Sequence, residues 1–460
     1  MGRFQNPDHK GVDVSLTRRK KTLALTAGAA IFALTLAGCT SEEPAEDPTT
    51  ENTSSGEETA DAEPVELTIA TFNTPGFSNS ENDAEFQYDL IEEYMELNPN
   101  VTVTYNRAAE SGDARENFFT KLGPGGLADV EMVEVDWMPE VMQYSDLLAD
   151  LSSPDVEGRW IDFVEAGATD QDGRLIGYGT DTGPQAVCYR ASLFEEAGLP
   201  SSPDEVAALL EGDWANFFSV GDDYVEGSGG AAFFDSASGV WQGMVNQLDQ
   251  AYEDPETGEL IVLDNPEVKA LYDQLTAASE TQSSHFGQWS EDWFAGLSNG
   301  AYATMLCPPW MLGVIEGNAV DTTDWNVANV YPNGGGNWGG SWLTVPASGS
   351  NIEEATKLAA WLTAPEQQAK AFANAGTYPS QIAAYDDPAV TGAVNAYFND
   401  APIGEIFAER AQAVVPSPFK GEFYFQVNDA INNALTRVED GTDDPAASWD
   451  KAVADIEAIG

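Results

Sequence analysis

Basic residues are scarce in this sequence. Its 460 residues include 19 lysines and arginines but 77 aspartates and glutamates, which gives a formal net charge of −58 at pH 7. A field of this sign repels phosphate backbones and anionic lipid surfaces, so we expect no nucleic acid and no anionic ligand as a partner. We interpret the acidity mainly as a source of solubility in an external medium.

Histidines and catalytic motifs are nearly missing too. Only His9 and His285 are present, and G-x-S-x-G, H-E-x-x-H and P-loop motifs do not occur. The stretch "DQDG" at 170–173 lacks the distal glutamate of a calcium loop, which favours a plain turn. We therefore expect no enzyme, no metal site and no cofactor. A glycosidase stays open as the alternative, because so many acidic residues make chance carboxylate pairs abundant.

Cysteine occurs three times, and its first occurrence follows a short apolar run. A basic block at 18–21 precedes the uncharged residues 22–36, which are too few for a span of ~20 residues and are typical of a secretory signal. The sequence "LAGC", ending at Cys39, resembles the bacterial lipobox. That resemblance implies cleavage before Cys39 and acylation of its thiol. An ordinary signal peptide with a chance cysteine is the alternative.

The residues after Cys39 are acidic and contain no aromatic or large aliphatic side chain up to Pro64. Such a segment buries too little apolar surface to offset its ordering entropy. We therefore predict a signal peptide at 1–38, a disordered tether at 39–65 and a folded body of ~395 residues, enough for two lobes. The lipid on Cys39 would be the only membrane contact, and would hold the body on the extracellular face of the cell membrane.

Strand and helix patterns alternate at the start of the body. In order, they are a strand at 67–72, a helix at 86–97, a strand at 101–105, a helix ending at 118–122 and a strand at 129–135. This order predicts an α/β fold with mainly parallel sheets and flanking helices. Ligands in such sheets lie beyond the carboxyl ends of strands, which directs attention to the loops at 73–80 and 136–139.

Two segments that contain or precede glycines indicate where the chain passes between two lobes. They lie at 179–183, in "GYGTDTGPQ", and at 327–332, before "NGGG". We predict an N-terminal lobe formed by 66–179 and 331–365, and a C-terminal lobe formed by 183–329 and 371–460, with a hinge between them.

Several longer segments carry a family resemblance. "YRASLFEEAGLP", "FAGLSNGAYATMLCPPWMLG", "WNVANVYP", "GGSWLTVPASGSNIEEATKLAAWLTAPEQQAKAF" and "GTYPS" resemble the extracellular solute-binding proteins of ABC importers, in the carbohydrate-binding branch that includes maltose-binding protein. "GPQAVCYR", "CPPWMLG" and "GNWGGSW" are similar to the actinobacterial type that takes up cellobiose and related oligosaccharides.

The resemblance implies a two-lobed, monomeric receptor. It would capture a neutral oligosaccharide between its lobes, with cellobiose or a related β-linked gluco-oligosaccharide as the best specific candidate. It would then deliver the sugar to a membrane permease of an ABC importer. A secreted carbohydrate-active enzyme, or a binding protein for another neutral solute, is the alternative.

Aromatic residues are abundant, with 12 Trp, 15 Tyr and 21 Phe. Indole rings stack on the C–H faces of sugars, while carboxylates, amides and backbone groups bind the hydroxyl rim. For each aromatic candidate the alternative is a place in the core, and for the acids it is a helix cap or turn. The predicted ligand-binding residues are Asn73, Phe77, Asp136, Trp137, Asp181, Trp241, Trp310, Trp338, Gly339, Gly340, Trp342 and Phe423.

The two cysteines other than Cys39 form an even number in a compartment that permits oxidation. Cys188 lies in the strand pattern "AVCYR", and Cys307 ends the strand pattern "YATMLC" of the same predicted lobe. We predict a disulfide between them. Two buried free thiols are the alternative.

Overall fold

The computed structural model describes residues 63–81, 85–415 and 417–459. The predicted signal peptide, lipid site and nearly all of the predicted tether lie outside these residues. No helix in the described ranges is long and apolar enough to cross a membrane.

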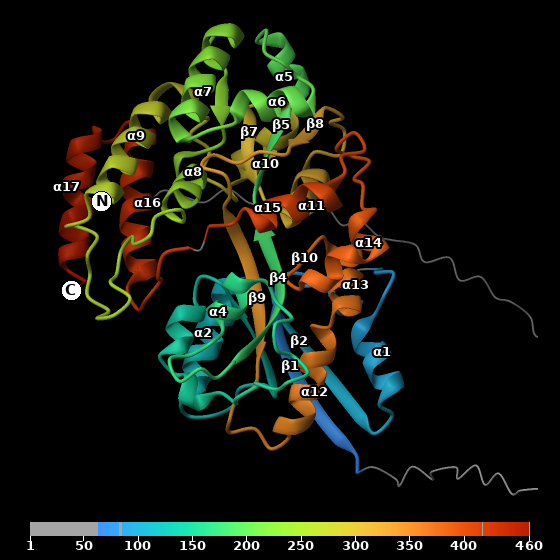
Figure 1. Cartoon of the computed structure of the whole chain (residues 1–460). Coiled ribbons are helices and arrows are strands. Elements are labelled where there is room, and N and C mark those ends of the chain that lie inside the picture. The colour runs from blue at the N-terminus through green and yellow to red at the C-terminus, as the bar shows by residue number, and fades with distance from the viewer. Residues whose placement is uncertain (1–62, 82–84, 416, 460) are drawn as a thin grey trace, which may run out of the picture. The chain divides into compact units, whose positions relative to one another are not determined.

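A six-stranded sheet forms the centre of the first lobe (Figure 1), in the order β10-β4-β9-β3-β1-β2. Strand β1 (Val65–Phe72) pairs in parallel with β2 (Val101–Ala108) and β3 (Val130–Glu134), because helices α1 (Leu90–Leu97) and α2 (Ser111–Leu122) return the chain between them. Strand β9 (Asn337–Thr344) is antiparallel to β3 and to β4 (Gly177–Pro184), and β10 (Tyr378–Pro379) is antiparallel to β4.

A four-stranded sheet, in the order β6-β7-β5-β8, forms the centre of the second lobe. Strand β5 (Ala186–Arg190) is antiparallel to β7 (Tyr302–Cys307) and β8 (Trp325–Ala328), and β6 (Ala232–Phe234) is parallel to β7. The α/β class is confirmed, but the expectation of mainly parallel sheets is wrong. Both sheets are mixed, because β5 and β9 are each reached from the other sheet. Parallel neighbours are instead joined by a helical crossover within one sheet.

Helices cover both sheets. Several begin at a side chain that accepts a hydrogen bond from the first turn, as Asp213 does from Asn216 N and Ser290 does from Trp293 N. The remaining α-helices are α3 (Met138–Met142), α4 (Asp162–Gly167), α5 (Ala191–Glu196), α6 (Pro203–Leu210), α7 (Trp214–Ser228), α8 (Ala237–Val245), α9 (Pro266–Gln282), α10 (Glu291–Asn299), α11 (Pro309–Asn318), α12 (Ile352–Leu362), α13 (Pro365–Ala375), α14 (Pro388–Thr391), α15 (Ile403–Gln412), α16 (Tyr424–Glu439) and α17 (Pro445–Glu457), with 3-10 turns η1 (Ser145–Leu147) and η2 (Ile382–Asp386).

Alternation along β5 shows how the second sheet is buried on both faces. Val187 and Tyr189 belong to a core shared with α7, α8, α9 and α16, whereas Ala186 and Cys188 belong to a core shared with α10, α11 and α15. Successive side chains of a strand point to opposite faces, so two separate apolar layers are needed. A third core lies around the first sheet.

The chain passes between the sheets beside a pair of antiparallel strands. Strand β4 stays in the first sheet to Pro184, and β5 begins in the second sheet at Ala186; the return runs from the end of β8 to β9. At Gly183 a Cβ atom would lie 1.9 Å from the carbonyl oxygen of Trp338, so only glycine allows β4 and β9 to approach this closely. The assignment of residue ranges to lobes stays an interpretation of these passages.

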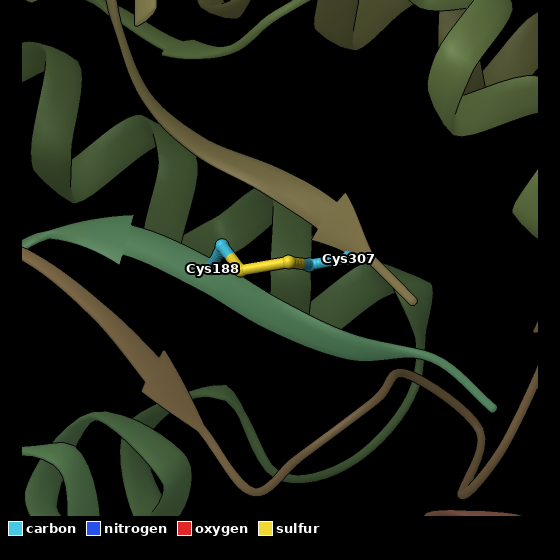
Figure 2. The surroundings of a disulfide bond; sticks show 2 residues. All are labelled: Cys188 and Cys307. Atoms are coloured by element: carbon cyan, nitrogen blue, oxygen red, sulfur yellow. A yellow bond between two sulfur atoms is a disulfide. The ribbon is translucent and has the colours of Figure 1, made fainter. Parts of the chain in front are cut away.

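Cys188 and Cys307 are joined by a disulfide, with 5.5 Å between their Cα atoms (Figure 2). The bond links the neighbouring strands β5 and β7, and both residues are fully buried. This is the pairing expected from the sequence, and it lies within one lobe.

Candidate functional site

Four ionisable side chains gather where β3 ends. Glu134 is the last residue of β3, and Asp181 lies on β4. Ser341 of β9 pairs with both, so these three side chains project from the same face of the first sheet. Asp136 forms an ion pair with Lys420, from the segment before α16. We call Glu134, Asp136, Asp181 and Lys420 the polar cluster; it connects the first sheet with the segment before α16.

Burial raises the pKa of two carboxyl groups of the polar cluster, Glu134 and Asp181. Burial and the neighbouring Asp136 carboxylate raise the pKa of Glu134, and Lys420 offsets part of this rise. Burial raises the pKa of Asp181 to about 6, although Thr180 Oγ1 donates a hydrogen bond of 2.6 Å to its carboxylate. Carboxyl groups in this state can both accept hydrogen bonds from ligand hydroxyls and, when protonated, donate to them.

A cavity of about 820 Å³ has Lys420 in its wall. Residues after β3 and around α4 form one side, with Trp342 of β9, and residues after α15 form the other. Its volume lies within the range of small-molecule sites, about 300–1,000 Å³. The main lining residues are Val135, Met138, Pro139, Ile161, Asp162, Phe163, Asn337, Trp342, Gln412, Val414, Pro418, Phe419 and Lys420.

Three tryptophans meet near the start of α11. Trp310 Nε1 donates a hydrogen bond of 3.0 Å to the carbonyl oxygen of Trp338, and the two rings pack edge to face with centroids 5.0 Å apart. Trp289 lies nearly parallel to Trp310, with 18° between the ring planes and centroids 6.1 Å apart. We call Trp289, Trp310 and Trp338 the aromatic cluster. This cluster connects β9 of the first sheet, which carries Trp338, with α11, which carries Trp310.

The structure buries four of the predicted ligand-binding aromatics. The exposed fractions of Phe77, Trp137, Trp241 and Trp342 are 3%, 1%, 0% and 4%. Trp137 packs against Phe118 and donates to Ser111 Oγ, and Trp241 donates to the Tyr252 hydroxyl. The enclosed rings of Phe77, Trp137 and Trp241 offer no free face for stacking on a ligand, whereas Trp342 lines the cavity.

The other predicted positions are accessible to different degrees. Asn73 is exposed with a positive φ of 52°, and its carbonyl oxygen accepts from Arg107 Nη1 at 2.7 Å. Phe423 is partly buried, and its N–H donates to Glu253 Oε2.

Two glycines of β9 have a left-handed backbone, and one of them, Gly339, lies against the aromatic cluster. Gly339 and Gly340 have φ values of 98° and 115°. A Cβ at Gly339 would lie 3.0 Å from Trp310 Nε1. Glycine at this position therefore allows Trp310 to lie against the backbone of β9.

Sequence reasoning missed Trp289, Glu134 and Lys420. The sequence "SPFKGEF" around Lys420 is unremarkable, although a lysine in so acidic a chain is a weak signal by itself. Its burial and its pairing with Asp136, 284 positions away, depend on the tertiary fold. Among the described residues, no group of His, Cys, Asp and Glu is arranged to hold a metal ion.

The model of a known family matches residues 89–397 of this chain, and its description is "Bacterial extracellular solute-binding protein". The chain belongs to this family. The members are binding proteins, and the resemblance noted from the sequence is confirmed at this level.

One curated relative of this solute-binding protein is the arabinooligosaccharide-binding protein of Bacillus subtilis (strain 168). The two are 25% identical over 305 residues, which is 64% of this chain and 64% of the relative. The match thus spans less than two thirds of that relative's own length.

Solved structures of related proteins share the fold. A structure described as an extracellular solute-binding protein of family 1 is 42% identical, with a TM-score of 0.79, over 86% of this chain and 99% of that one. The binding protein from B. animalis subsp. lactis Bl-04, in complex with beta-1,6-galactobiose, has 16% identity and a TM-score of 0.65 over 86% and 96% of the chains. The sugar-binding protein MalE of Xanthomonas citri has 18% identity and a TM-score of 0.66 over 85% and 96%. The two-lobed architecture is therefore that of the family.

Proposed function

We propose that this solute-binding protein captures a neutral oligosaccharide outside the cell and delivers it to the permease of an ABC importer. The carrying observation is that one strand, β9, takes part in both clusters: Trp338 belongs to the aromatic cluster, and Ser341 pairs with Glu134 and Asp181 of the polar cluster. Trp338 and Ser341 are three residues apart on β9, a distance of about 10 Å in an extended strand. An indole face for a sugar ring and carboxyl groups for its hydroxyls are thus available to one ligand of more than one ring.

The relatives support this ligand class. One is described as binding arabino-oligosaccharides, and one was solved with β-1,6-galactobiose. We favour cellobiose or a related β-linked gluco-oligosaccharide as the specific ligand, on the motifs around Cys188, Trp310 and Trp338. Charged sugars are disfavoured, because the polar cluster has three carboxyl groups but one lysine, which is already paired with Asp136.

Ligand binding would act on the relation of the two lobes. A sugar that contacts Trp310 from the second lobe and Glu134 or Asp181 from the first binds more tightly when these surfaces are close. It therefore shifts the population toward the closed arrangement. The permease would recognise this arrangement on a monomeric receptor.

The anchor is part of the proposal. Lipid on Cys39 would keep the receptor at the outer face of the cell membrane, near its permease. Cys39→Ala should release the protein into the medium or leave it uncleaved. Equal retention of wild type and variant on membranes after alkaline washing would overturn this part.

A panel of sugars tests the ligand class. Thermal unfolding of the wild-type protein is followed with cellobiose, maltose, β-1,6-galactobiose, arabinobiose and, as a charged control, cellobiuronic acid, and calorimetry then gives each affinity. We expect stabilisation by at least one neutral sugar and none by cellobiuronic acid. Each mixture is also analysed for cleavage products, because hydrolysis would identify an enzyme instead.

A further inference from the structure

Trp289 combines two unfavourable features. Its indole is 50% exposed, and its backbone φ is +69°. The left-handed region is tolerated by glycine and by short polar residues, but it costs of order 1–3 kcal/mol for a bulky side chain. The other non-glycine residues with positive φ in the described part of the chain are four Asn or Asp residues and His285. A strained backbone that presents an aromatic ring to solvent indicates a function outside the core.

A buried carboxylate binds side chains on both sides of Trp289 in the sequence. Asp235, 1% exposed, accepts hydrogen bonds at the same oxygen, Oδ2, from Gln288 Nε2 at 2.8 Å and Trp293 Nε1 at 2.9 Å. Both bonds are charge-assisted when Asp235 is ionised. Gly239 permits this arrangement, since a Cβ there would lie 2.4 Å from Gln288 Nε2. The loop conformation is thus held by contacts on either side of the strained residue.

The ring of Trp289 is held against Trp310. Its plane lies within 18° of the Trp310 plane, and Trp293 packs on it with ring centroids 5.2 Å apart. Trp310 is itself fixed by its hydrogen bond to the Trp338 carbonyl oxygen. Trp289, which is 50% exposed, therefore adds accessible indole surface next to Trp310.

We propose that Trp289 is a second stacking surface that contacts the next ring of a bound oligosaccharide beyond Trp310, and that Asp235 is a positioning residue for it. This inference rests on the proposed function and specifies it: the preferred ligand is a chain longer than the part that Trp310 contacts. Trp289 would then determine chain-length preference, whereas Trp310 would contribute to binding at every length.

Calorimetric titration with two length series tests this. The ligands are cello-oligosaccharides and arabino-oligosaccharides of two, three and four units, titrated into wild type, Trp289→Ala and Trp310→Ala. For Trp289→Ala we expect affinity for the longest bound ligand to fall about 10-fold and that for the shortest to change less than about 2-fold. Trp310→Ala should weaken all lengths. Trp449→Ala is the matched control, because Trp449 is a partly exposed tryptophan on α17 that packs on Tyr272.

Asp235→Asn and Gln288→Ala test the positioning role. Each variant should reduce the preference for longer ligands, as Trp289→Ala does, but by a smaller factor. A merely structural role would weaken all lengths equally, and circular dichroism checks that each variant is folded. Gln288→Ala keeps the test decisive if Asp235→Asn does not fold.

The outcomes separate the two levels of the proposal. If wild type binds neither sugar series, the proposed function fails for these ligands, and this inference is overturned with it. If wild type binds these sugars and Trp289→Ala binds each length as tightly as wild type does, only the role of Trp289 is overturned. An equal loss of affinity at all lengths in Trp289→Ala also overturns this role.

Discussion

Lys420 and Asp136 form an ion pair that connects the segment before α16 with the segment after β3. Asp136 follows β3 of the first sheet, while Lys420 precedes α16, which packs in the core of the second lobe. The Lys420 side chain is 3% exposed and also lies over the Tyr424 ring, with 4.8 Å from Nζ to the ring centroid. A cation in this position reduces the repulsion among the carboxyl groups of the polar cluster.

Lys420→Met alone should lower the free energy of unfolding more than the double variant that also neutralises its partner Asp136. Loss of one member of a buried pair leaves a charge uncompensated, so we expect the free energy of unfolding to fall by about 3 kcal/mol. The double variant Lys420→Met with Asp136→Asn should lose less. Urea unfolding at pH 7 measures both, and Lys357→Met, from an exposed ion pair, should change stability by less than about 1 kcal/mol. A double variant that loses as much stability as Lys420→Met, or more, would contradict the coupling.

Trp310→Ala should weaken oligosaccharide binding by about 2 kcal/mol, because the variant removes a partly exposed ring that is fixed against β9. The affinity is measured by calorimetry with the sugar that stabilises the wild type most. Circular dichroism should stay native, and Trp449→Ala serves as the control. An unchanged affinity would leave Trp310 with a packing role alone.

Glu131 predicts a pH dependence of stability. Burial raises its pKa from 4.5 to about 7, so the folded state binds this proton more tightly than the unfolded state. Below pH 4.5 both states are protonated and Glu131 has no effect; from there to about pH 7 it lowers the free energy of unfolding increasingly, and above pH 7 the loss is constant. Glu131→Gln should therefore raise the free energy of unfolding at pH 8 by up to about 3 kcal/mol.

Denaturant unfolding at pH 4 and pH 8 checks the Glu131 prediction. Wild type and Glu131→Gln should coincide at pH 4 and differ at pH 8. The exposed Glu353→Gln variant is the control, since its side chain is 84% exposed. A difference of the same size at both pH values would point to packing instead of ionisation.

Loss of the disulfide should lower stability without affecting ligand binding. The bond closes a loop with a sequence separation of 119, for which the chain-entropy relation gives about 5 kcal/mol, although measured effects are commonly 2–4 kcal/mol. Cys188→Ala with Cys307→Ala is compared with wild type by urea unfolding and by sugar titration. Because both cysteines lie in one lobe, the relation between the lobes stays free. A lost affinity in a folded variant would contradict this view.

Local patterns predicted the first part of the fold well. The expected strands at 67–72, 101–105 and 129–135 overlap β1, β2 and β3, since alternation over a few residues suffices to define them. The antiparallel entry of β4 and β9 was not foreseen. It depends on pairings between residues such as Asp181 and Ser341, 160 positions apart, and no local pattern records them.

The candidate site was harder to predict. Trp137 and Trp310 both lie near the end of a strand, yet one ring is enclosed by Phe118 and Phe72 and the other is partly exposed. The difference arises from what α2 covers, which sequence periodicity does not reveal. Trp289 escaped notice because neither its left-handed backbone nor its contact with Trp310 is visible in "FGQWSED".

The buried disulfide also affects how the protein can be produced. Neither Cys188 nor Cys307 has accessible surface in the folded protein, so an oxidant added after folding cannot reach the sulfur atoms. The bond must form while the chain is still open, in an oxidising compartment. Recombinant material made in a reducing cytosol would fold around two thiols and keep them. Two preparations of identical sequence would then differ in stability solely through the compartment in which they were synthesised.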